Sequence, residues 1–90
     1  AEDRGVAATL RRAIARARQR AENRAREEVR RRLAALVAES GFTAAEFAAR
    51  LGTSPSRLST YLSGKVVPSA ALLVRAEAVP AAGAENHAAQ

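Results

Sequence analysis

Hydroxyl and guanidinium side chains are concentrated in one short stretch of this sequence, residues 54–60. Arg57 stands there among four hydroxyl residues, which are Ser54, Ser56, Ser59 and Thr60. A hydroxyl donates one hydrogen bond and accepts two, and a guanidinium presents five N–H donors in a planar fork that fits paired acceptor atoms. The chemistry that these groups predict is hydrogen-bond recognition of a polar ligand.

Groups suited to catalysis are nearly absent. His87 is the only histidine, and it lies in an Ala-rich terminal stretch without a carboxylate cluster, which is typical of a solvated side chain. The lack of Cys excludes disulfides, thiol nucleophiles and Cys-type zinc sites. No Gly-rich phosphate loop, GxSxG elbow or HExxH motif occurs. We therefore expect no enzyme activity, no cofactor, no metal and no small-molecule substrate.

Composition indicates one small and strongly basic domain. The 90 residues carry 15 Lys and Arg against 9 Asp and Glu, a formal net charge of +6, and fourteen of the cations are Arg. Three aromatic residues and 24 Ala predict a thin core, with stability that is modest or supplied partly by a second subunit. No apolar run approaches the roughly 18–20 residues that span a bilayer, and no signal-peptide pattern opens the chain. We expect a soluble, cytoplasmic protein without a membrane partner.

Residues 6–39 predict one long helix of about 30 residues, because nearly all of them are good helix formers. Gly41 follows Ser40 as the expected stop. Three Glu–Arg pairs at four-residue spacing support the helix, namely Glu22–Arg26, Glu27–Arg31 and Glu28–Arg32.

The apolar stripe of this helix changes direction along its length. At about 100° per residue, the N-terminal apolar positions centre about 115° away from the C-terminal ones around Leu33. The C-terminal third is therefore expected to pack on the rest of the domain and the N-terminal third on something else. A dimer contact would use Leu10, Ile14, Ala17 and Ala21. The alternatives are a solvated surface with salt bridges and an arm that binds phosphates directly.

Three short helices separated by tight turns are expected after Gly41. Each begins with a hydroxyl N-cap and ends close to a Gly or a Pro. They are 44–51 capped by Thr43 with Glu46 in a capping box, 55–62 capped by Ser54 with Pro55 at the first position, and 70–79 capped by Ser69. The expected division of the chain is a helical extension over 1–30, a domain over 31–79 and a flexible tail over 80–90.

The first two short helices, joined by Gly52-Thr53-Ser54, have the pattern of a helix-turn-helix. Ala48 or Ala49 leaves room for the two helices to cross closely, and Gly52 tolerates the positive φ of the turn. The second helix buries one apolar face, formed by Leu58 and Leu62. Its outward residues are then Ser56, Arg57, Ser59 and Thr60.

The stretch RRLAALVAESGFTAAEFAARLGTSPSRLSTYLSGKVVPSAALLVRAEAV, residues 31–79, resembles the XRE / lambda-repressor-Cro family of DNA-binding domains. The residues that carry the resemblance are Ala48, Gly52, Leu58, Tyr61, Gly64-Lys65 and Pro68-Ser69. The resemblance implies an all-α fold with four of the family's five helices. It also implies that helix 55–62 lies in the major groove of double-stranded DNA, and that a homodimer binds a palindromic site.

Individual DNA contacts also follow from the resemblance. The implied base-reading residues are Ser54, Pro55, Ser56, Arg57 and Thr60, and the implied backbone contacts are Thr43, Ser59, Ser63 and Lys65. Arg57 is the strongest candidate for specificity, because a guanidinium binds guanine O6 and N7 bidentately. The sequence departs from the family at Ala44, where Gln is common, and at Pro55, where many members have a polar residue.

We expect sequence-specific binding of double-stranded DNA by a small XRE-type transcriptional regulator, such as a repressor, that acts as a homodimer through its N-terminal helix. One alternative is a protein-interaction or scaffold module built on the helical hairpin, which Ala44 and Pro55 favour. The other is a nucleoid-type protein that binds DNA without sequence preference through its Arg charge.

Overall fold

The computed structural model describes residues 2–83, which form four α-helices and no strand within that range. The helices are α1 (Glu2–Ser40), α2 (Ala44–Leu51), α3 (Pro55–Leu62) and α4 (Ala70–Ala78). The expected all-α fold is confirmed. Residues 84–90, most of the expected flexible tail, lie outside the described residues. None of the helices formed by residues 2–83 has the length and apolarity to span a bilayer.

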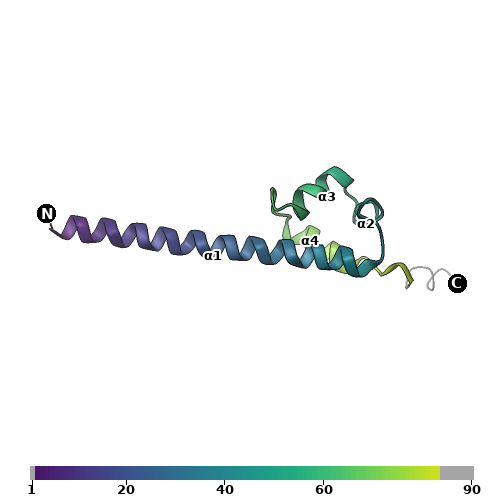
Figure 1. Ribbon diagram of the computed structural model, residues 1–90, viewed down its shortest axis with the longest axis horizontal. Coiled ribbons are helices and arrows are strands. Elements are labelled where there is room, and N and C mark those ends of the chain that lie inside the picture. Colours follow the sequence, from purple (N-terminus) through teal and green to yellow (C-terminus); the bar gives the residue numbers. More distant parts are fainter. Residues whose placement is uncertain (1, 84–90) are drawn as a thin grey trace.

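Helix α1 dominates the shape of the molecule. Its 39 residues correspond to about 58 Å at 1.5 Å per residue, and the chain extends over 75 × 21 × 18 Å. Figure 1 shows α2, α3 and α4 gathered against the C-terminal end of α1, while its N-terminal half stands away from them. The helix begins at Glu2, before the predicted start at Val6, because Gly5 costs only about 0.5–1 kcal/mol inside a helix and does not end one.

Side-chain caps define the starts of the three short helices, as predicted. The Thr43 hydroxyl accepts from the Glu46 N–H at 3.1 Å, and the Glu46 carboxylate accepts from the Thr43 N–H at 2.9 Å, which completes the capping box. These hydrogen bonds lower the pKa of Glu46. The hydroxyl of Ser54 accepts from the N–H of Arg57 at 3.0 Å, and Ser69 caps α4 in the same way.

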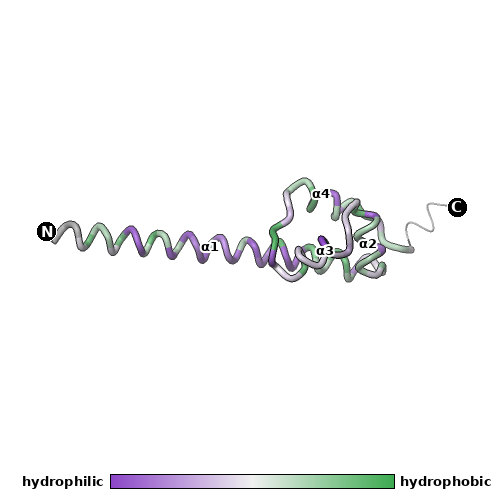
Figure 2. Tube along the Cα trace, turned by 90° about the horizontal axis from the view of Figure 1, so that it is seen from above, coloured by the Kyte–Doolittle hydropathy of each residue, from purple (hydrophilic) through white to green (hydrophobic). Residues whose placement is uncertain are grey.

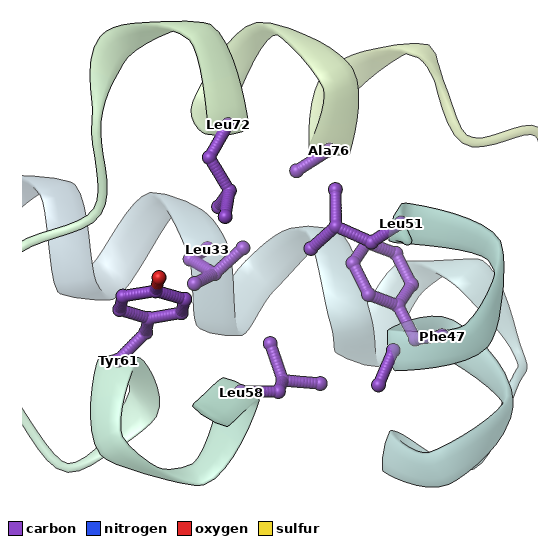
Figure 3. Packing of buried hydrophobic residues seen from close by; sticks show 8 residues of the cluster. Leu33, Phe47, Leu51, Leu58, Tyr61, Leu72 and Ala76 are labelled. Atoms are coloured by element: carbon purple, nitrogen blue, oxygen red, sulfur yellow. The ribbon is translucent and has the colours of Figure 1, made fainter. Parts of the chain in front are cut away.

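The core lies between the last turns of α1 and the three short helices. Its buried members are Leu33, Phe47, Ala48, Leu51, Leu58, Tyr61, Leu72 and Ala76. Figure 3 shows Leu58 and Tyr61 reaching from α3 toward Leu33 of α1. Leu33 and Leu58 are completely buried. The prediction that the C-terminal third of α1 packs on the rest of the domain is thereby confirmed.

The ion pairs on α1 differ partly from the predicted ones. Glu28 pairs with Arg32 at 3.2 Å, as predicted, and also with Arg31. Glu27 pairs with Arg30 at 2.5 Å and not with Arg31. Both three- and four-residue spacings bring side chains together on a helix, so the rotamers decide between them. Glu22 and Arg26, the third predicted pair, make no ion pair within residues 5–83.

Candidate nucleic-acid interface

The turn between α2 and α3 is set by backbone hydrogen bonds around Gly52. The Thr53 N–H donates to the Ala48 carbonyl at 2.9 Å and the Gly52 N–H donates to the Ala49 carbonyl at 3.2 Å, which is the Schellman arrangement of a helix end. Gly52 has φ 85°, in the left-handed region that favours glycine. Since Ser54 caps α3 two residues later, the direction of α3 relative to α2 is fixed by local chemistry.

Helix α3 buries one face and presents the other to solvent. Leu58 and Tyr61 point into the core, and Leu62 packs partly against it. Ser56, Arg57 and Ser59 are exposed on the other face. Thr60, at the edge of this face, is partly exposed. The polar and apolar faces of α3 therefore lie as the sequence pattern predicts.

The hydroxyl groups around α3 differ in how much of their hydrogen-bonding capacity is free. Thr60 donates to the Arg57 carbonyl at 2.6 Å, and Ser63 donates to the Thr60 carbonyl at 3.1 Å. Ser54 accepts from the Arg57 N–H as the N-cap. By contrast, the side chains of Ser56, Arg57 and Ser59 have no hydrogen bond or ion pair to any residue that the structure describes. These three are the groups most available to a ligand.

An open hollow of about 590 Å³ lies over the exposed face of α3. It is lined by Ser54, Ser56, Arg57, Thr60, Tyr61 and Val66. The structure thus brings four of the five predicted base-reading residues into one concave surface, with Pro55 beside it at the first position of α3. A neighbouring hollow over the turn shares Ser54 and Arg57 with it.

Val66 is a lining residue that the sequence reasoning did not identify as part of the site. It is 49% exposed although its side chain is apolar, so the hollow combines an apolar contact with hydroxyl and guanidinium groups. Val66 follows directly after the turn Gly64-Lys65, and this position was the feature of the sequence that could have indicated its place beside α3.

The residues predicted to contact a DNA backbone lie at the start of α2, on α3 and in the turn after α3. Thr43 is the N-cap of α2 and Ser63 is the C-cap of α3. Ser59 is exposed on α3, and Lys65 is exposed in the turn that follows it. The predicted dimer residues, in contrast, lie on the N-terminal half of α1, away from α3. All four are exposed, namely Leu10, Ile14, Ala17 and Ala21.

Charge along residues 47–76 of the sequence has one sign. Between Glu46 and Glu77 the sequence contains no Asp or Glu, while four cations occur there, namely Arg50, Arg57, Lys65 and Arg75. The guanidinium of Arg50 stacks on the Phe42 ring, 3.8 Å from its centroid, which holds one of these charges in place. The surface around α3 is therefore suited to an anionic ligand and has no acidic group on α3 itself to repel one.

Comparison with protein families agrees with this geometry. The family model described as a helix-turn-helix domain matches residues 6–85. This chain belongs to that helix-turn-helix family. The match begins inside α1, well before residue 31, so the helix-turn-helix family region includes much of the part of α1 that stands away from the core. No curated protein and no solved structure matches the chain.

Proposed function

We propose that this helix-turn-helix protein is a non-enzymatic, sequence-specific binder of double-stranded DNA that acts in the cytoplasm as a small XRE-type transcriptional regulator. The observation that carries the proposal is the exposed face of α3. The side chains of Arg57 and Ser56 make no hydrogen bond or ion pair with the described residues. They line a hollow together with Thr60 and Ser54. A helix-turn-helix family match and the absence of acidic residues between 47 and 76 support the same conclusion.

The dimensions of α3 suit the major groove. An α-helix with its side chains is about 10–12 Å in diameter and the major groove is about 12 Å wide, so α3 can enter with its exposed face against the base edges. Arg57 would bind guanine bidentately, which discriminates between bases by about 1–3 kcal/mol. Ser56 and Thr60 would contribute less selective contacts. Thr60 already donates its proton to the helix, so it would act as an acceptor toward a base amino group.

Backbone contacts would place α3 in register on the duplex. Thr43, Ser59 and Ser63 have exposed hydroxyl groups, and Lys65 adds a mobile point charge in the turn after α3. Such contacts with phosphates fix orientation without reading sequence. Binding is consequently expected to weaken with salt, because each neutralised phosphate releases condensed counterions.

Dimerisation through the N-terminal half of α1 is part of the proposal. Val6, Leu10 and Ile14 are 60%, 57% and 52% exposed in the single chain. Exposed apolar side chains in one stripe are stabilised when a second copy covers them. A two-fold dimer would present two α3 helices to the two halves of a palindromic site.

Selection of preferred duplexes from a random pool tests the proposal directly. Gel shifts then compare the recovered sequence with a scrambled duplex for the unmodified protein, Arg57→Ala and Arg75→Ala. Both variants lose one positive charge, but Arg75 lies on α4, so only Arg57→Ala should reduce the preference for the recovered duplex.

Unchanged discrimination by Arg57→Ala would show that α3 is not the reader. Equal affinity for every duplex would support the non-specific alternative, and no binding even at low salt would support the protein-interaction alternative.

A further inference from the structure

The N-terminal half of α1 has no support from the rest of the domain. Residues 5–27 are exposed, apart from Ala8 and Ala13, which are partly exposed. Figure 2 shows this half as an isolated rod with hydrophilic and hydrophobic residues along it. An isolated helix is only marginally stable in water, so this half of α1 gains stability from anything that binds it.

Positive charge is concentrated on this rod and is not neutralised there. Between Arg11 and Arg26 there are seven Arg, and Glu22 is the only acid. None of these seven guanidinium groups makes a hydrogen bond or ion pair with residues 5–83. The next segment differs, because Glu27 and Glu28 pair with the three Arg at 30–32.

Three of these arginines form a row along the rod. Arg12, Arg16 and Arg20 follow one another at four-residue spacing, about 6 Å apart along the axis, and Arg24 continues the spacing but lies about 80° beyond their centre around the helix. Like charges at this spacing destabilise a free helix by about 0.2–0.5 kcal/mol per pair. The arrangement is therefore unfavourable for a solvated helix and becomes favourable when a polyanion lies along it.

The arginine row lies toward the side of α1 on which α3 ends. A Cβ added at Gly64, two residues beyond α3, would lie 3.5 Å from Cδ of Arg30, so the turn that carries Lys65 rests on α1 beside Arg30. At about 100° per residue, the row centres within about 40° of Arg30 around the helix axis. The cationic surface at the end of α3 thus continues along the rod.

We infer that the arginine row, Arg12, Arg16 and Arg20, binds the phosphates of the duplex that flanks the site occupied by α3. The inference rests on the proposed function, because α3 brings the duplex to this side of the molecule. A regular row of like charge is complementary to a regular polyanion, and the nearest such ligand is the duplex itself. The contacts carry no sequence information. They extend the bound region by about 27 Å beyond Arg30, or about eight base pairs.

The test compares two triple variants of the full chain that have the same net charge. Arg12→Gln/Arg16→Gln/Arg20→Gln removes the row. Arg11→Gln/Arg18→Gln/Arg26→Gln is the matched control, because these three arginines also lie on the rod without an ion pair to residues 5–83, but they centre about 125° away from the row around the axis. Gln is about as good a helix former as Arg, and circular dichroism of both variants checks that the helix is retained.

The measurement is the salt dependence of binding to the duplex recovered by selection, alone and with eight additional base pairs on each side. For each bound subunit, the row variant should reduce the slope of log K against log salt by about 2.7, that is about 0.9 for each lost phosphate contact, and the control by less than half of that. The unmodified protein and the control should bind the extended duplex more tightly than the short one, and the row variant should bind both equally.

The inference would be overturned if the two variants reduced the salt slope equally, or if the unmodified protein bound the longer duplex no more tightly than the short one. Either result would leave α3 as the reader. A change in molecular mass without a change in slope would also overturn it and would assign the row to protein contacts. Failure of the unmodified protein to bind any duplex would instead refute the proposed function.

Discussion

Replacing Gly52 by Ala isolates the backbone strain in the turn that positions α3. Gly52 has φ 85°, and a Cβ added there meets nothing within 4 Å. The substitution therefore changes no packing contact, and only the conformational cost remains. For an L-residue in the left-handed region this cost is about 1–2 kcal/mol. We expect the free energy of unfolding to fall by that amount, and the Tm to fall by about 4–8 °C for each kcal/mol in a domain of this size.

Urea unfolding followed by circular dichroism measures the effect. Gly52→Asn should lie between the natural protein and Gly52→Ala, because Asn enters the left-handed region more easily than Ala. Gly5→Ala is the matched control, since its Cβ also meets nothing within 4 Å but its backbone is helical. Ala exceeds Gly in helix propensity by about 1 kcal/mol, so Gly5→Ala should increase helicity.

Backbone strain predicts that the free energy of unfolding is highest for the natural protein, lower for Gly52→Asn and lowest for Gly52→Ala. If Gly52→Ala proves as stable as the natural protein, or if the Asn variant is the least stable of the three, the proposed conformation of the turn is wrong. A strained but folded Gly52→Ala protein should also lose affinity for the selected duplex, because the turn sets the direction of α3.

Three further predictions concern the core, the rod and the capping box. Leu58→Ala should lower the free energy of unfolding by about 2–5 kcal/mol in urea titrations, and Leu62→Ala by clearly less, because Leu58 is completely buried and Leu62 only partly. Polar replacement of Leu10 and Ile14 by Gln should convert a dimer into the 9.5 kDa monomer in light scattering, and an unchanged mass would remove the apolar stripe of α1 from the dimer proposal. The pKa of Glu46 is lowered from its ordinary 4.5 by its hydrogen bonds to Thr43. The contribution of Glu46 to the free energy of unfolding is therefore complete above pH 4.5 and is lost as the pH falls through the folded pKa. Glu46→Gln should flatten this part of the stability profile between pH 3 and 6, and an unchanged profile would show that the carboxylate charge does not contribute.

Features that depend on neighbouring residues could be predicted from the sequence. Ser54 caps α3 and Thr43 caps α2 because a hydroxyl reaches an N–H three residues later, whatever the rest of the chain does. Gly52 ends α2 for an equally local reason. The resulting helix-turn-helix, the burial of Leu58 and the exposure of Arg57 all follow from these caps together with helical periodicity.

Features that depend on rotamers or on the path of a loop could not be predicted. Glu27 reaches Arg30 although Arg31 stands at the equally accessible four-residue spacing. The Thr60 hydroxyl donates to the Arg57 carbonyl of its own helix, while the Ser56 hydroxyl makes no hydrogen bond to the described residues. The residue types alone do not distinguish the two. Val66 joins the hollow over α3 only because the turn after the helix folds back beside it.

The N-terminal half of α1 has separate sides for its two proposed contacts. At about 100° per residue, three directions divide the circumference of α1 into sectors of about 100–140° each. They are the core direction at Leu33, the arginine row, and the apolar stripe of Leu10 and Ile14. A second copy packed on the apolar stripe therefore leaves the arginine row uncovered. The three cations of the row therefore do not oppose dimerisation, since a duplex along the row would neutralise them on a side that the partner helix does not reach. Dimer formation and flanking DNA contact are then expected to reinforce each other, because each orders a rod that the domain core does not support.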